Sequence, residues 1–410
     1  MDWLTIIYLI YSFIAFYFLF LFVLIYAQNY KLIHVVPAIT KKRDVSIVIP
    51  CYNEEKNIGK TIQNLIDNGY SELKKIIVVD DCSKDDSYRI MKQYEKKYPG
   101  LVLAVQTPKN TGNAAGAKNY GSKFAKTELI GFTDADSFPQ KGAIEKIIGF
   151  FDDKKVGAVT STVLVYNRKN FLERLQAIEY IVIKFTRKLL EFVDSIYVTP
   201  GPLAIYRREY FEKVGRFDES NLTEDIEITW RFLSNGYDIK MSVPSRVYSV
   251  APSKVKDWFK QRIRWNMGGV QTMLKYSKYF LKKGMLGNFV LPFFVFSWVI
   301  GVFGLVIITY RVLRGIILRY LSTSYSIEAQ TAILSFGDIK LVPNVLLFMG
   351  LVVFFFSLLY TLVAFFSIKE KGFRRPGFGA MTFYIFLYLL VYPVILIISA
   401  YKLLIGRKNW

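Results

Sequence analysis

The apolar residues of this chain are gathered into long blocks rather than spread evenly along it. Leu4–Ala27 carries no charge, and three later blocks of similar character are Phe289–Tyr310, Leu341–Phe366 and Met381–Leu404. A helix of about 20 apolar residues crosses the hydrocarbon core of a bilayer. The pattern therefore predicts one membrane helix near the amino terminus and about three in the segment 286–410.

The first apolar block has two interpretations. A cleavable signal peptide would begin with basic residues, but only Asp2 carries a charge before this block, which is also long for such a peptide. We therefore interpret residues 1–30 as a membrane anchor. Basic residues follow it, namely Lys31, Lys41, Lys42 and Arg43. Because basic flanks face the cytoplasm, we expect a multi-pass protein of the cell membrane whose soluble part is cytoplasmic.

The soluble part, residues 44–250, shows an alternation of strands and helices. Strands are expected at Ser46–Ile49, Lys75–Val79, Val102–Gln106 and Leu129–Phe132. Helices are expected near Glu55–Asp67, Lys84–Lys97 and Asn113–Ala125. Runs of Val and Ile separated by helices of this length are typical of βαβ units. We predict an α/β domain with a mostly parallel sheet.

Polar loops follow three of these strands. They read Pro50-Cys51-Tyr52-Asn53-Glu54, Asp80-Asp81-Cys82-Ser83 and Thr133-Asp134-Ala135-Asp136. Ligands of open parallel sheets bind at such strand ends. Asp134 and Asp136, one residue apart, can both approach a hard cation such as Mg²⁺ or Mn²⁺. An isolated Asp-x-Asp would equally fit a capped turn, but Asp80 and Asp81 at a neighbouring strand end favour a diphosphate site.

Two helix starts carry further charged residues. Gly112–Gly121 opens a helix with small residues, and a helix amino terminus favours anions. Its spacing matches neither a phosphate loop nor a dinucleotide fingerprint. Lys118 is a candidate phosphate ligand, with a solvated helix lysine as the alternative. Glu224 and Asp225 open a later helix, where they either cap it or accept a proton from an acceptor hydroxyl.

The segment 251–285 interleaves aromatic and basic residues, which is typical of amphipathic helices lying in a membrane interface. Gln261, Arg264 and Trp265 share one helix face, at positions i, i+3 and i+4. A purely lipid-facing helix explains the basic residues but not this alignment. We expect the face to meet the active site, with Arg264 holding a diphosphate. The segment Arg311–Ser335 is expected to be a loop or an interfacial helix.

The net charge of +21 is compatible with nucleic acid, anionic lipid or a phosphorylated substrate. Many basic residues flank the apolar blocks, so we expect a lipid bilayer as the partner and no nucleic acid. The single histidine, His34, excludes any site that needs several imidazoles; we expect it to serve in packing beside the membrane. Cys51 and Cys82 are expected to be reduced thiols.

These segments together resemble the family 2 glycosyltransferases, specifically the membrane-embedded synthases of the hyaluronan, cellulose, chitin and poly-N-acetylglucosamine type. The last of these has the most similar layout. Any one motif is weak evidence, but all of them in this order are specific. The matching elements are Val48–Glu54, Asp80-Asp81, Asp134-Ala135-Asp136, Thr223-Glu224-Asp225 and Gln261-Arg262-Ile263-Arg264-Trp265.

The resemblance implies a GT-A type nucleotide-sugar-binding domain and an inverting transfer from a nucleotide sugar, usually a uridine diphosphate sugar, to a growing polysaccharide. It implies that Asp134 and Asp136 place the metal, that Asp225 is the base beside Glu224, and that Gly201 lines the acceptor path. The substrate-binding positions it implies are Pro50, Tyr52, Glu54, Asp80, Asp81, Lys118, Asp134, Gln261, Arg264 and Trp265.

Several alternatives stay open. Transfer of a single sugar to a lipid acceptor, as ceramide and polyprenyl-phosphate glucosyltransferases perform, would use the same aspartates. The sequence does not select the sugar, the cation or an accessory membrane subunit.

Overall fold

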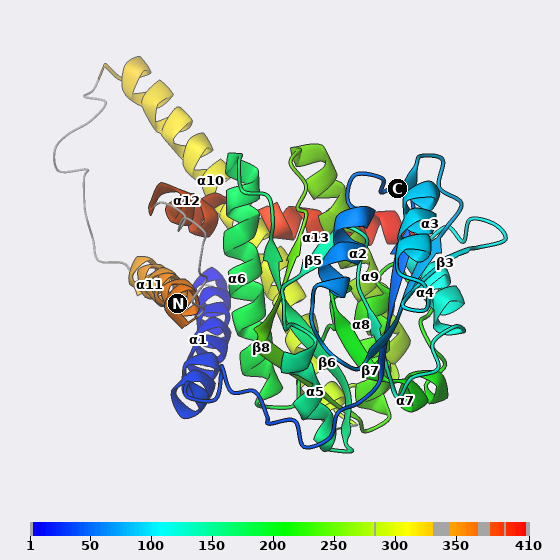
Figure 1. The fold of residues 1–410 in the computed structure, drawn as a ribbon. Coiled ribbons are helices and arrows are strands. Elements are labelled where there is room, and N and C mark those ends of the chain that lie inside the picture. The colour runs from blue at the N-terminus through cyan, green and yellow to red at the C-terminus, as the bar shows by residue number, and fades with distance from the viewer. Residues whose placement is uncertain (1–2, 283, 331–344, 368–377, 389–390, 407–410) are drawn as a thin grey trace.

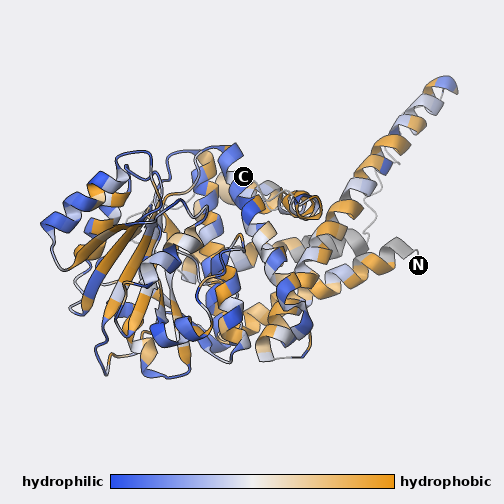
Figure 2. Cartoon of the chain, turned by 90° about the vertical axis from the view of Figure 1, so that its right-hand side faces the viewer, coloured by the Kyte–Doolittle hydropathy of each residue, from blue (hydrophilic) through white to orange (hydrophobic). Residues whose placement is uncertain are grey.

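The computed structural model describes residues 3–282, 284–330, 345–367, 378–388 and 391–406. A layered α/β domain has a twisted sheet at its centre and helices on both faces of the sheet. The helices α1 (Trp3–Asn29), α10 (Leu291–Glu328) and α11 (Val345–Ser367) extend from one side of this domain (Figure 1). Figure 2 shows that the projecting helices are mostly apolar over their lengths, whereas the helices on the sheet turn polar faces outward.

An eight-stranded sheet in the order β3-β2-β1-β4-β7-β6-β8-β5 forms the centre of the described residues. Strands β3, β2, β1 and β4 are parallel, and Ile47 of β1 pairs with Ile76 of β2 and Gly131 of β4. Beyond them β7 is antiparallel to both β4 and β6, β8 is parallel to β6, and β5 is antiparallel to β8. This confirms the predicted α/β class. The strands are β1 (Val45–Cys51), β2 (Leu73–Asp80), β3 (Val102–Gln106), β4 (Leu129–Phe132), β5 (Ser137–Pro139), β6 (Val156–Val165), β7 (Ala204–Arg207) and β8 (Asp238–Ser249).

Alternate residues of each central strand are buried on opposite faces of the sheet, as the two-residue period of a strand requires. Val48 packs into a cluster with α4 and α6, while Ile47 and Ile49 pack into a second cluster with α2, α3 and α5. The helices of the domain are α2 (Ile58–Ile66), α3 (Ser87–Lys97), α4 (Ala114–Ser122), α5 (Glu145–Ile148), the 3₁₀ turn η1 (Gly149–Asp152), α6 (Phe171–Glu191), α7 (Arg208–Lys213), α8 (Glu224–Ser234), α9 (Val255–Tyr276) and the 3₁₀ turn η2 (Ser277–Tyr279).

Two of the described helices are long and apolar enough to cross a membrane, namely Leu9–Asn29 and Leu286–Glu328. A bent pair of helices, Gly379–Phe386 and Val391–Leu404, meets the test if it is counted as one span, and Phe354–Ser367 is a shorter apolar helix. The remaining elements are the π-helical turn η3 (Leu286–Val290), α12 (Phe378–Phe383), the π-helical turn η5 (Tyr384–Tyr388) and α13 (Val391–Leu404).

These helices differ from the sequence prediction in two places. Helix α10 continues through Glu328, so most of Arg311–Ser335 is neither a loop nor a separate helix; residues 331–335 lie outside the described part. The sequence from 311 to 328 contains no proline that would end the helix. The predicted block Met381–Leu404 is bent by 43°. Pro393 lies in the first turn of α13, where a proline is tolerated, although it would interrupt one continuous helix.

Helices α6 and α9 join the sheet domain to the apolar helices. An Asn170–Glu173 capping box fixes the start of α6. One side of α6 packs against β6 and other parts of it contact α1, α11 and α12, while α9 packs between α8 and α13. His34 Nε2 lies 2.7 Å from the carbonyl oxygen of Ser367, so it packs against the end of α11.

Candidate active site at the carboxyl ends of the strands

A cavity of about 750 Å³ lies where β1, β2 and β4 end. Its wall joins the strand-end loops to α4, α6, α8, α9, α10 and the region of α13. The predicted site residues that line it are Pro50, Tyr52, Glu54, Asp81, Lys118, Asp134, Asp136, Gly201, Glu224, Asp225, Gln261, Arg264 and Trp265. The structure thus gathers segments that are far apart in the sequence around one space.

Asp80 is the predicted residue that does not line this cavity. Its buried carboxylate accepts a hydrogen bond from Gln106 Nε2 at 2.7 Å and others from the backbone of Ser83. Asp81, the next residue, accepts hydrogen bonds from Thr107 Oγ1 at 2.8 Å and from the backbone nitrogen of Thr111 at 2.9 Å. Asp80 therefore supports the loop from behind, whereas Asp81 presents a fixed carboxylate at the cavity wall.

Asp134 and Asp136 lie between the end of β4 and the start of β5. Ala135 between them is buried, and its carbonyl oxygen accepts a hydrogen bond of 2.6 Å from Thr61, which fixes the turn. Burial, together with the negative charges of Asp134 and Glu54, raises the pKa of Asp136 to about 7. The turn therefore concentrates negative charge at one point of the cavity.

Lys118 of α4 connects two acidic groups. Its side chain is 2 % exposed, and Nζ lies 2.8 Å from Glu224 Oε1 and 3.5 Å from Asp134 Oδ1. Burial alone would lower the pKa of Lys118, but the carboxylates of Glu224 and Asp134 outweigh that effect and raise it. The lysine is therefore charged, and it holds the start of α8 against the acidic turn after β4.

Glu224 and Asp225 are neighbours with opposite electrostatic properties. Burial disfavours the charged form of both carboxyls, but Lys118 lowers the pKa of Glu224 overall. Burial and the charge on Glu224 raise the pKa of Asp225 to about 7. Glu224 is thus an ionised partner of the lysine, whereas Asp225 can exchange a proton near neutral pH.

Two glycines permit the close approaches that shape the cavity. A β-carbon at Gly201 would lie 2.5 Å from Asp134 Oδ2, so a side chain there would displace the carboxylate. A β-carbon at Gly268 would collide with Thr223 Oγ1, just before α8 begins. Because of this contact, α9 lies directly on the start of α8 and brings Gln261, Arg264 and Trp265 to the cavity.

A buried ion pair fixes α9 to its surroundings. Arg262 Nη2 lies 2.5 Å from Glu179 Oε2 on α6, and Tyr388 and Tyr392 donate hydrogen bonds to the same carboxylate. Arg262 also donates to Gln261 Oε1, and its guanidinium carbon lies 4.0 Å from the centre of the Trp265 ring. Arg262 therefore orients two of the predicted cavity residues.

Helix α6 contributes a part of the wall that the sequence analysis missed. Its cavity-lining residues are Glu179, Tyr180, Ile183, Lys184 and Arg187, which share one helix face. Basic residues spaced along one face of a helix were the available signal. That pattern also fits an amphipathic helix at a surface, so it does not by itself indicate a site.

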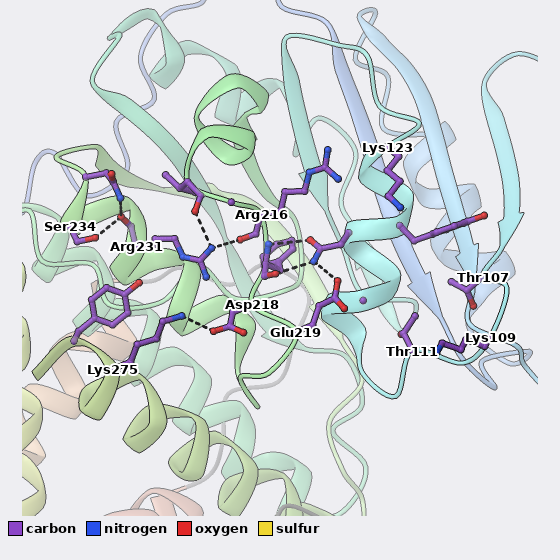
Figure 3. Close-up of a pocket in the computed structure, with 18 of the residues that line it drawn as sticks. Thr107, Lys109, Thr111, Lys123, Arg216, Asp218, Glu219, Arg231, Ser234 and Lys275 are labelled. Atoms are coloured by element: carbon purple, nitrogen blue, oxygen red, sulfur yellow. Dashed lines mark hydrogen bonds and ion pairs between the residues drawn. The ribbon is translucent and has the colours of Figure 1, made fainter.

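A second, more open cavity of about 1080 Å³ lies on the other face of α4 (Figure 3). Its acidic side chains already have partners: Asp218 binds Lys275 at 2.6 Å, and Glu219 accepts a hydrogen bond from Asn119. Arg231 donates to the carbonyl oxygen of Arg216 at 2.8 Å and pairs with a glutamate of its own helix. The paired charges make this cavity a weaker candidate for chemistry than the acidic one.

A sheet of this topology with an acidic turn after β4 defines a GT-A glycosyltransferase fold. Residues 46–215 match the family described as Glycosyl transferase family 2, so the chain carries a family 2 glycosyltransferase domain.

Curated relatives agree with this family. The chain is 31% identical over 268 residues to "Probable glycosyltransferase YdaM" of Bacillus subtilis (strain 168), an alignment that covers 64% of either chain. It is 26% identical over 285 residues to "Poly-beta-1,6-N-acetyl-D-glucosamine synthase" of Staphylococcus epidermidis, covering 69% of this chain and 68% of the relative. The chain thus spans about two thirds of the length of these relatives.

A solved structure resembles nearly the whole chain. It is "Mannosyltransferase PcManGT from Pyrobaculum calidifontis in complex with GDP-Man and Mn2+", with a TM-score of 0.62 and 17% sequence identity over 97% of this chain and 99% of that chain. At this identity the likeness establishes the fold.

Proposed function

We propose that the protein is a membrane-bound inverting glycosyltransferase that transfers a sugar from a uridine diphosphate sugar to a growing polysaccharide. The observation that carries the proposal is that Asp134, Asp136 and Asp225 line one cavity, in which Lys118 pairs with Asp134 and Glu224. The poly-N-acetylglucosamine synthase among the relatives supports the polysaccharide product.

The donor would occupy the part of the cavity formed by the loops after β1 and β2. Tyr52 and Glu54 line it on one side, and the Asp81 carboxylate is oriented by Thr107 and Thr111 on the other. An ordered carboxylate beside an exposed aromatic ring is suited to a nucleoside, because it offers hydrogen-bond acceptors and a stacking surface. Pro50 and Asp80 would shape this part of the site without supplying its charge.

Asp134 and Asp136 fit a Mg²⁺ or Mn²⁺ ion. Their carboxylate oxygens are the ligands that these hard cations prefer. Within the described residues, no group of three or more acidic, histidine or cysteine side chains is close enough to hold a metal ion. The cation would therefore take its other ligands from the donor diphosphate and water. When bound, it neutralises charge on the leaving diphosphate.

Asp225 is the group proposed to accept the proton of the acceptor hydroxyl. Glu224 is engaged by Lys118 and so positions the helix start, whereas Asp225 has a pKa near neutrality. Arg264 would support the leaving diphosphate from α9, and Trp265 would stack on the acceptor. Gly201 would keep the acceptor path open beside Asp134.

Turnover of purified protein in lipid, with a panel of nucleotide sugars, tests this proposal. Asp225→Asn should reduce turnover by about 10²–10⁴-fold while donor binding is kept. Chelation of divalent cations should abolish turnover, and Mg²⁺ or Mn²⁺ should restore it. Asp218→Asn in the second cavity is the matched control and should remain active. Wild-type turnover in Asp225→Asn would refute the assignment.

A second candidate function is transfer of one sugar to a lipid acceptor. It is favoured by the reach of the cavity to Phe294 and Trp298 of α10 and to Tyr392 of α13, which belong to apolar helices. Sizing of the labelled product separates the two functions: a ladder of long chains indicates a polysaccharide, and a single glycolipid species indicates the alternative.

The same proposal places the protein in the cell membrane with several spans and the sheet domain in the cytoplasm. The apolar helices and the basic residues after α1 support it. Labelling of single cysteines introduced on either side of α1, in intact and permeabilised cells, tests the orientation.

A further inference from the structure

Arg187 of α6 is a buried cation at the cavity wall. The residue is 5% exposed and lines the same cavity as the catalytic carboxylates. Its Nε atom has no hydrogen-bond partner among the residues that the structure describes. Burial lowers the pKa of Arg187, and the nearby Tyr197 hydroxyl and Asp225 carboxylate offset this only in part. The guanidinium is therefore incompletely compensated.

Three other buried cations of the domain each pair with an acidic side chain. Arg262 pairs with Glu179 at 2.5 Å, Lys118 with Glu224 at 2.8 Å, and Lys188 with Glu191 at 2.8 Å. A buried charge is unfavourable unless a counter-charge and hydrogen bonds accompany it. A buried cation that has no such partner and faces a cavity rather than packed protein therefore indicates a binding site for an anionic ligand.

The position of Arg187 shows which part of the ligand it would meet. The carboxylate that acts on its pKa is that of Asp225, the proposed base. Lys184, one turn earlier on α6, lines the same cavity, as do Phe294 and Trp298 of α10. Arg187 is thus close enough to the proposed base to feel its charge, and it shares the cavity wall with aromatic side chains of an apolar helix.

We propose that Arg187, with Lys184 beside it, forms an anion subsite for the phosphate of a lipid acceptor that also carries a free hydroxyl. The phosphate would bind Arg187, the apolar chains would leave past Phe294 and Trp298, and the hydroxyl would face Asp225. The subsite rests on the proposed sugar transfer, and its ligand would be the first acceptor, the lipid on which synthesis of the saccharide begins.

The proposed step forms one bond at the anomeric carbon and breaks another. The acceptor hydroxyl oxygen forms a bond to the anomeric carbon of the donor sugar, and its proton passes to Asp225. The bond between that carbon and the diphosphate oxygen breaks, and the diphosphate leaves with the electron pair. Arg187 takes no part in bond making; it is a binding residue that holds the phosphate so that the hydroxyl reaches the base.

Lipid binding tests the subsite independently of turnover. Purified protein with bound uridine diphosphate is titrated with fluorescent phosphatidylglycerol, which has both a phosphate and hydroxyls, and with fluorescent diacylglycerol, which has a hydroxyl but no phosphate. We expect wild type to prefer phosphatidylglycerol. Arg187→Met should weaken phosphatidylglycerol binding at least tenfold and leave the Kd for uridine diphosphate unchanged. Arg174→Met, an exposed arginine of the same helix, is the control and should bind like wild type.

Sugar transfer in nanodiscs then tests the acceptor role. Labelled sugar should enter the lipid fraction with phosphatidylglycerol and not with diacylglycerol, and Arg187→Met should raise the apparent KM for phosphatidylglycerol at least tenfold. Equal binding of the two lipids, or wild-type binding by Arg187→Met, would overturn the subsite. Displacement of the lipid by inorganic phosphate at equal concentration would show that the site takes free phosphate instead, which also overturns it.

The two proposals fail in different ways. If no nucleotide sugar is turned over, the proposed function fails, and the binding measurement still decides the subsite. If sugar is transferred only to soluble oligosaccharides, with no dependence on lipid phosphate, the proposed function stands and the lipid acceptor is refuted.

Discussion

Two arginines are buried beside the proposed active site, and they differ in what surrounds them. Arg262 of α9 is enclosed by the Glu179 carboxylate, which Tyr388 and Tyr392 also contact. Arg187 of α6 faces the cavity with its charge only partly compensated. The charge of Arg262 is compensated within the folded protein, whereas the charge of Arg187 would be compensated by a bound ligand. Burial alone therefore does not tell a structural charge from a binding charge; the partner does.

Breaking the compensated pair should have the largest effect. Glu179→Gln leaves Arg262 buried without its counter-charge, which we expect to destabilise the protein by about 3–5 kcal/mol. Arg187→Met removes a poorly compensated charge, so its thermal stability should equal or exceed that of wild type. Thermal unfolding in detergent measures both. A loss of stability in Arg187→Met as large as that in Glu179→Gln would contradict the distinction.

The double variant Glu179→Gln/Arg262→Met sharpens the same comparison. It removes both members of the pair and leaves no buried charge, so it should be more stable than Glu179→Gln alone. Activity should stay low, because Gln261 and Trp265 lose the side chain that orients them. Recovery of both stability and activity would show that Arg262 has no positioning role.

Two adjacent glycines of α9 provide a matched test, with a smaller expected effect, of the contact between α9 and the start of α8. Gly268→Ala places a methyl group against Thr223 and should destabilise the protein by about 1–3 kcal/mol. Gly269→Ala meets no atom within 4 Å and should stabilise the helix by about 0.5–1 kcal/mol. Opposite changes in unfolding temperature are expected. Equal changes would mean that α9 does not lie on the start of α8.

The pH dependence of turnover should show the smallest effect. Asp225 can accept a proton only when ionised, so kcat/KM should fall as the pH drops below about 7 and level off above it. Glu224 and Asp134 raise this pKa, and Lys118 and Arg264 lower it. Because Arg187 and Asp225 also attract each other, Arg187→Met should move the midpoint to higher pH. A midpoint near that of an exposed aspartate would exclude Asp225 as the base.

The same raised pKa has a consequence for stability. A folded-state pKa above that of an exposed aspartate means that the folded protein binds the proton more tightly than the unfolded chain does. Protonation of Asp225 therefore stabilises the folded state in acid, and this contribution to the free energy of unfolding is lost as the pH rises through about 7. Asp225→Asn should flatten that part of the pH–stability curve.

Much of the fold could be predicted from the sequence because local patterns determine it. The strand Leu129–Phe132 and the three strands parallel to it are mostly apolar runs with helices between them, and the structure confirms them. The continuation of α10 past Tyr310 and the bend before α13 were not predicted, because the length of an apolar block does not fix where a helix ends or bends. Helix α10 runs on through exposed residues that include no proline, whereas Pro393 lies close to the bend.

The predicted residues that line the cavity lie at strand ends and on α4, α8 and α9, whereas those of α6 were missed. Asp134 and Asp136 follow β4, where topology alone brings ligands close. Asp80 and Asp81 looked equivalent in sequence, but Asp80 ends β2 and its carboxylate is bound by Gln106, so only Asp81 lines the cavity. Arg187 could not be recognised, because its burial depends on elements far away in the chain.

Tyr392 contributes to the wall of the cavity and binds Glu179, yet it follows the QRIRW segment by more than a hundred positions in the chain. When Trp265 has been translated, each carboxylate of the proposed chemistry has therefore been made. Tyr388 and Tyr392, which bind the carboxylate of the ion pair that fixes α9, have not. We expect nascent protein to stay inactive until its final apolar segments have been inserted, so that membrane assembly precedes any consumption of donor.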